Sequence, residues 1–239
     1  MIVLDRKKIL MIVIGIFCFS AIMCTNIKQV EESVLTSSTP VTEKVVVLDA
    51  GHGKPDEGAQ GVEGVTEEKT NLEIALKLQK LLEESGATVI LTRSDENAIY
   101  DLDKTTLREM KVSDIKNRVK IGNESSADIF VSIHLNKIPQ QQYDGWQTFY
   151  NVKSTEGQKL AVSIQNSLNT AIQKENNRVA KSIDNVYIVK HVEIPITIVE
   201  CGFLSNPEEE QKLLNDEYQN RLSWGIYNGI IDYFYDGNS

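Results

Sequence analysis

The chain has 239 residues, of which 41% are hydrophobic and 25% charged, and its formal net charge is −9. This composition excludes a disordered chain, because it supplies enough apolar side chains for a core. The negative charge argues against nucleic acid as a partner, since phosphates would be repelled. The length suits one well-buried domain behind a short N-terminal segment of different composition.

That N-terminal segment begins with a basic cluster at positions 6–8, followed by an apolar run that ends at Cys24. Charge before a short apolar core predicts a signal peptide or signal anchor over residues 1–24, with the rest of the chain exported. The run is shorter than the roughly 20 residues that span a bilayer comfortably, so membrane contact is expected only through this segment. Cleavage stays open, as does lipidation at Cys24, which follows two bulky residues.

Residues 25–43 are polar, with runs of Ser and Thr, and predict a linker. The domain over residues 44–239 then alternates apolar runs with helical periodicity. Helices are predicted at 67–85, 106–124, 155–175 and 207–235, the last broken near residue 217; strands are predicted at 44–49, 88–92, 128–133, 145–150, 185–189 and 194–199. This alternation predicts an α/β domain built on one mostly parallel sheet.

Three of the apolar runs lead directly into a residue that can bind a metal or move a proton, namely His52, His134 and Glu200. In open α/β sheets ligands bind beyond the carboxyl ends of the strands, so these side chains can converge near the start of the first helix. Two histidines and a carboxylate make a common catalytic zinc set, and a further carboxylate can transfer protons. The intervals are long, however, and no compact His-Glu-x-x-His motif is present.

Spacing alone therefore leaves other interpretations open. The histidines could be ordinary hydrogen-bonded groups, and Glu68 could simply favour the helix dipole. Glu200 could pair with Arg93 or Arg118. His191 is expected in a loop, exposed or near substrate.

A single cysteine, Cys201, remains beyond the leader, which excludes an internal disulfide. It is either a buried small residue or the nucleophile of a cysteine hydrolase.

Four ordered motifs resemble the zinc-dependent N-acetylmuramoyl-L-alanine amidases, with Arg93 and Arg118 at intervening positions. The resemblance covers residues 44–235, nearly the whole body of the chain. The motifs are DAGHG at 49–53, EK and NL within 68–72, SIHLN at 132–136 and VECGFLSN at 199–206.

The resemblance implies that Zn²⁺ is the cofactor, bound by His52, Glu68 and His134, and that Glu200 is the catalytic glutamate. Glu68 is preferred to its neighbour Glu67 because it directly precedes Lys69. The candidates for orienting a ligand or contacting substrate are Asp49, Asn136, Arg93 and His191.

The resemblance also implies a twisted sheet of about six strands flanked by helices, and hydrolysis of the lactyl–L-alanine amide of peptidoglycan. The compact form is most similar to the spore-cortex branch of the family, in which this step leads to muramic δ-lactam. Control is expected to come from expression, from location or from an accessory regulatory protein. The alternatives are a zinc peptidase acting on the stem peptide and a non-catalytic wall-binding module.

Overall fold

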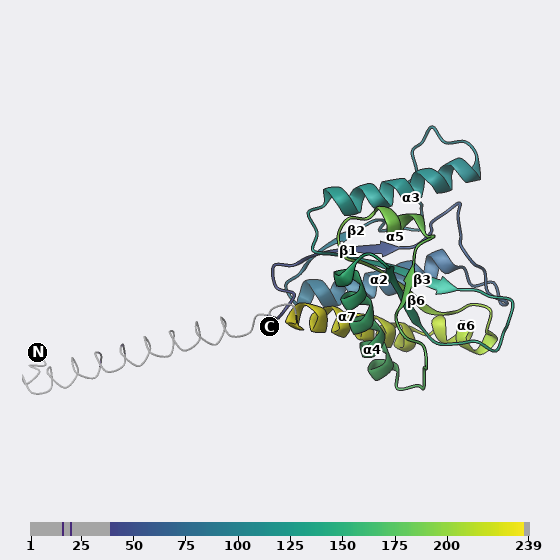
Figure 1. The fold of residues 1–239 in the computed structure, drawn as a ribbon. Coiled ribbons are helices and arrows are strands. Elements are labelled where there is room, and N and C mark those ends of the chain that lie inside the picture. The colour runs from purple at the N-terminus through teal and green to yellow at the C-terminus, as the bar shows by residue number, and fades with distance from the viewer. Residues whose placement is uncertain (1–15, 17–19, 21–38, 237–239) are drawn as a thin grey trace, which may run out of the picture. The chain divides into compact units, whose positions relative to one another are not determined.

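The computed structural model describes positions 16 and 20 and residues 39–236 (Figure 1). The other residues of the predicted leader, and residues 25–38 of the predicted linker, lie outside the described residues. The folded unit begins at Pro40, and Val41 is fully buried in the core, so the domain starts before the predicted boundary at residue 43. Among the described residues, no helix is long and apolar enough to cross a bilayer.

Six strands form one sheet in the order β2-β1-β3-β6-β4-β5. All neighbouring pairs are parallel except β4 and β6. This confirms the expected single α/β domain with a mostly parallel sheet. The strands are β1 (Val45–Ala50), β2 (Thr88–Leu91), β3 (Ile129–Asn136), β4 (Gln147–Asn151), β5 (Lys181–Ile183) and β6 (Ile196–Phe203).

Helices cover both faces of this sheet (Figure 1). One face is covered by α2 (Glu67–Glu84), α4 (Thr155–Ile172) and α7 (Asp216–Asp236); the other is covered by α3 (Leu107–Glu124) and the short α5 (Tyr187–His191), while α6 (Pro207–Leu213) follows β6. Each face has its own apolar core because the central strands are buried on both sides.

One predicted element is wrong, and the break in the last helix lies earlier than predicted. Residues 185–189 are not a strand: residues 187–191 form α5, whose Ile188 and Val189 pack into the core. The strand of this region, β5, lies earlier and has only three residues, too few to give a periodic pattern. The last helix is interrupted at residues 214–215 rather than 217.

Candidate metal centre

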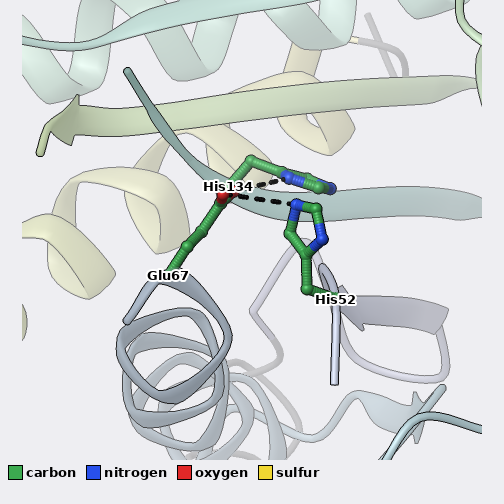
Figure 2. Close-up of side chains that lie close together, drawn as sticks. All are labelled: His52, Glu67 and His134. Carbon is green, nitrogen blue, oxygen red and sulfur yellow. Dashed lines mark hydrogen bonds and ion pairs between the residues drawn. The ribbon is translucent and has the colours of Figure 1, made fainter. Parts of the chain in front are cut away.

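Three side chains from distant parts of the chain meet at the carboxyl end of β3, as Figure 2 shows. His52 comes from the loop after β1, Glu67 from the first residue of α2, and His134 from within β3. Glu67 Oε2 lies 3.3 Å from His52 Nε2, and Glu67 Oε1 lies 2.9 Å from His134 Nδ1. One ligand atom from each residue lies within 4.8 Å of the others, a spacing that a single metal ion can bridge.

The carboxylate of this cluster belongs to Glu67 and not to Glu68, which corrects the sequence-based choice. Glu67 and Asn71 are four residues apart and share one face of α2. Asn71 Nδ2 donates to the Gly51 carbonyl, 3.1 Å away, so this face is turned toward the loop that carries His52. Glu68 is also buried, but its Oε2 has no hydrogen-bond partner and it is not part of the cluster.

Glycines make room for the cluster. A Cβ on Gly51 would lie 2.3 Å from the His134 ring, and a Cβ on Gly58 would lie 2.7 Å from Glu67 Oε2. His52 itself has a φ of 63°, in the left-handed region that non-glycine residues rarely adopt. The surrounding backbone holds this conformation, with Gly53 N donating to the Asp56 carbonyl at 2.9 Å.

Two buried arginines fix the end of β1 that carries this loop. Arg118 donates to the carbonyls of Ala50 and His52 and forms ion pairs with Asp49 and Asp114. Burial disfavours ionisation of Asp49, but the Arg118 charge and hydrogen bonds outweigh it and lower the pKa of Asp49. Asp49 is therefore linked to the backbone of His52 through Arg118, an indirect contact with the ligand that the sequence analysis expected it to orient.

Arg93 has a similar role. Its guanidinium donates to the carbonyls of Ala50, Gly51 and Glu68, at 2.8, 3.1 and 2.6 Å, and so ties β1 to the start of α2. No ion pair joins Glu200 to either arginine among the described residues, so the alternative pairing does not occur. Both arginines hold the backbone beneath the cluster.

Asp56 is a contact that the sequence analysis missed. Its Oδ2 lies 3.0 Å from His52 Nδ1, and its Oδ1 lies 2.7 Å from Lys111 Nζ on α3. With Nδ1–H donated to Asp56, loss of the Nε2 proton would leave the Nε2 lone pair of His52 available to a metal ion beside Glu67. A carboxylate that orients a histidine in this way is a regular feature of metal sites. The acidic loop that carries Asp56 can be identified in the sequence. The contact between Asp56 and His52, however, depends on the folded conformation of that loop.

We predict that Asp56→Asn weakens the binding of a metal ion such as Zn²⁺ to this cluster by roughly 10- to 100-fold, the usual cost of losing the hydrogen-bond partner of a ligand. Competition with a chromophoric chelator measures this. Glu57→Gln is the matched control, because Glu57 is exposed in the same loop. Equal affinities for the two variants would show that Asp56 does not orient a metal ligand.

The protonation states of His52 and Glu67 depend strongly on each other. Burial opposes protonation of His52, but its hydrogen bonds to Asp56 and Glu67 outweigh burial and raise the pKa of His52 to about 10. The two histidines hold the pKa of Glu67 far below its usual range, against the effect of burial. Without a cation, His52 therefore holds a proton at neutral pH, and a metal must displace it.

Glu200 lies beside this cluster on β6, directly opposite His134 in the strand register. Its Oε2 is buried and has no hydrogen-bond partner. Burial, assisted by the nearby Glu67 charge and opposed by the histidines, raises the pKa of Glu200 to about 7. A carboxyl with such a pKa can both accept and donate a proton near neutrality.

The remaining candidates lie outside the cluster. Asn136 is at the register shift of β3, where its carbonyl accepts from Leu204 N. His191 is exposed and stacks on Tyr187. Its carbonyl accepts from Asn123 near the end of α3, so it belongs to the amino ends of the strands, opposite the cluster.

Cys201 is fully buried in the core on the opposite face of β6 from Glu200. Burial raises the pKa of its thiol far above the usual range. A buried neutral thiol is a poor nucleophile, so the geometry does not support a cysteine hydrolase.

Residues 46–232 match the family described as N-acetylmuramoyl-L-alanine amidase. The chain is 39% identical over 197 residues to the germination-specific N-acetylmuramoyl-L-alanine amidase of Bacillus subtilis, covering 82% of each chain.

Solved structures agree with this match. The CwlD amidase from Clostridioides difficile, in complex with the GerS lipoprotein, has a TM-score of 0.79 and 41% identity, covering 81% of this chain and 100% of that one. The catalytic domain of CwlV from Bacillus (Paenibacillus) polymyxa var. colistinus has a TM-score of 0.69 and 31% identity, covering 80% and 97%.

Proposed function

Because the chain belongs to the N-acetylmuramoyl-L-alanine amidase family, we propose that His52, Glu67 and His134 bind a zinc ion and that Glu200 transfers protons. The reaction is hydrolysis of the amide between the lactyl group of N-acetylmuramic acid and L-alanine. The observation that supports these roles best is the placement of Glu200, which has a buried carboxylate oxygen without a partner beside a cluster with metal-ligand spacing.

The donor set fits zinc. Two imidazole nitrogens and one carboxylate oxygen suit a borderline cation, and three protein ligands leave a coordination position open for catalysis. When bound, zinc supplies a Lewis acid that polarises the substrate carbonyl and makes water more acidic. Asp56 and Glu67 both contact His52 and so fix its ring before the cation binds.

Glu200 then has two successive tasks. Its ionised carboxylate takes a proton from the attacking water, and the resulting carboxylic acid gives a proton to the departing L-alanine nitrogen. Glu200 is opposite His134 in the strand register and is not one of the three clustered residues, which supports a role in proton transfer rather than in metal binding. One group can perform both tasks only if its pKa lies near the working pH, as burial provides here.

The biological setting follows from the relatives. The similarity to a germination-specific amidase supports a role in spore cortex maturation. The CwlD relative was solved with a lipoprotein partner, which supports control of this enzyme by an accessory protein as well. Peptidoglycan lies outside the cytoplasmic membrane, so we propose that the N-terminal segment exports the enzyme.

Digestion of purified peptidoglycan tests the activity. We expect the zinc-loaded protein to release intact stem peptides beginning with L-alanine and to leave peptide-free glycan, as read by mass spectrometry. Chelation should stop the release, and added zinc should restore it. Fragments cut within the stem peptide would instead identify a zinc peptidase, and the absence of any zinc-dependent product would contradict the proposed activity.

A further inference from the structure

The strand register places three polar side chains in one row across the sheet. His134 on β3 is directly opposite Glu200 on β6, and Glu200 is directly opposite Gln147 on β4. Residues opposed in register point to the same face of a sheet. The row therefore continues the proposed catalytic site onto β4, where Gln147 Nε2 donates to the Val179 carbonyl at 3.0 Å and is held in place.

The same face continues one step further, to the edge of the sheet. Phe149 lies two residues after Gln147 and so points the same way, and it is directly opposite Lys181 on β5. Phe149 is half-buried and packs against the core under α3 and α5, leaving only part of its ring accessible, whereas Lys181 is exposed. A line drawn across the sheet from Glu200 therefore passes the amide of Gln147 and the ring of Phe149 and ends at the ammonium group of Lys181.

Lys181 has no ion-pair partner among residues 39–236, although the protein carries a net charge of −9. On the other flank of the cluster, the loop after His52 carries Glu57 and Glu63, while the charge of Asp56 in the same loop is paired with Lys111. An anionic chain leaving the site would be repelled by that loop and attracted toward β5.

On the basis of the proposed function, we propose that Gln147, Phe149 and Lys181 form the subsite for the stem peptide, with Lys181 binding one of its free carboxylates. In this arrangement the L-alanine end lies at Glu200, the peptide backbone crosses β4 beside Gln147, and an acidic residue reaches Lys181. The sugar strand then lies on the other side of the cluster.

An extended stem peptide is long enough to reach from Glu200 to Lys181. Two strand spacings and two residues along a strand place the Cα atoms of Lys181 and Glu200 roughly 12 Å apart. An extended peptide advances about 3.5 Å per residue, and a lysine side chain spans part of the gap. Stem residues two or three positions beyond the scissile amide therefore fall within range of the ammonium group.

Charge reversal tests this subsite with two matched substrates, a muramoyl tripeptide with free stem carboxylates and the same compound with those groups amidated. We expect Lys181→Glu to raise KM for the free acid roughly 3- to 10-fold, the effect of exposed charges at short range, with kcat little changed. KM for the amidated substrate should not rise, and Lys181→Arg should restore the free-acid KM.

Lys153→Glu is the control, because it makes the same charge change at another exposed lysine beyond the end of β4. An equal rise in KM for both substrates, or an equal effect in the Lys153 variant, would overturn the inference. No effect of Lys181→Glu on either substrate would overturn it as well. Failure of the wild-type protein to cleave either compound would count against the proposed function instead.

Discussion

A Glu200→Gln variant is expected to bind zinc with wild-type affinity and to lose roughly 10²- to 10⁴-fold in kcat, the usual contribution of a general acid–base group. The substitution keeps the shape of the side chain and removes its ability to exchange protons. Glu200 is not one of the three clustered ligand residues, so the metal should remain. Single-turnover rates on a soluble muropeptide, together with zinc content by elemental analysis, measure both parts of this result.

The pH dependence of the wild-type enzyme gives a second test of Glu200. The residue acts first as a base, so kcat/KM should rise as pH rises through its pKa. Burial raises that pKa to about 7, and the charge of a bound cation would lower it. The acid limb of the plot of kcat/KM against pH is therefore expected at or below neutral pH. The residual activity of Glu200→Gln should lack this limb.

Glu209→Gln is a useful control for the pH profile. Burial also raises the pKa of Glu209 to about 7, but its two oxygens accept from Gly145 N and Phe203 N, both at 2.7 Å. That variant should lower the melting temperature, because an amide cannot accept both bonds, and should keep the acid limb. Normal turnover by Glu200→Gln, or loss of the limb only in the Glu209 variant, would remove Glu200 from the mechanism.

The architecture was largely predictable because its strands are short apolar runs buried on both faces. Such runs contrast sharply with the amphipathic helices between them. The prediction failed between β4 and β6, where the structure uses a three-residue strand and a five-residue helix. The apolar residues of α5 contact the core in a single helical turn, which gives no period that distinguishes a helix from a strand.

The site was predictable to the extent that topology alone creates it. His134 and Glu200 face each other because β3 and β6 are adjacent parallel strands, and the loop after β1 brings His52 to the same edge. Asp56 could not be assigned, because its contact with His52 depends on the closure of the loop. The choice between Glu67 and Glu68 depends on the rotation of α2 about its axis, which Asn71 and Gly51 reveal only in three dimensions.

Glu67→Gln should lose zinc almost completely, with affinity falling by more than the roughly 100-fold that an outer-shell change costs. Within residues 39–236 the carboxylate is one of three clustered residues with metal-ligand spacing, and it also contacts His52 and His134. Its removal therefore deletes a ligand and frees the two histidine rings. Chelator competition measures the affinity, and circular dichroism checks that the apo protein remains folded.

Glu68→Gln is an unusually close control, since it changes the same residue type at the adjacent position of the same helix. Glu68 is 1% exposed and its Oε2 has no hydrogen-bond partner, so replacing the carboxyl by an amide of the same shape breaks no bond to that oxygen. Zinc affinity should stay within a few-fold of wild type. If Glu68→Gln lost the metal while Glu67→Gln kept it, α2 would have to be rotated in the metal-bound enzyme, and the cluster seen here would not be the catalytic one.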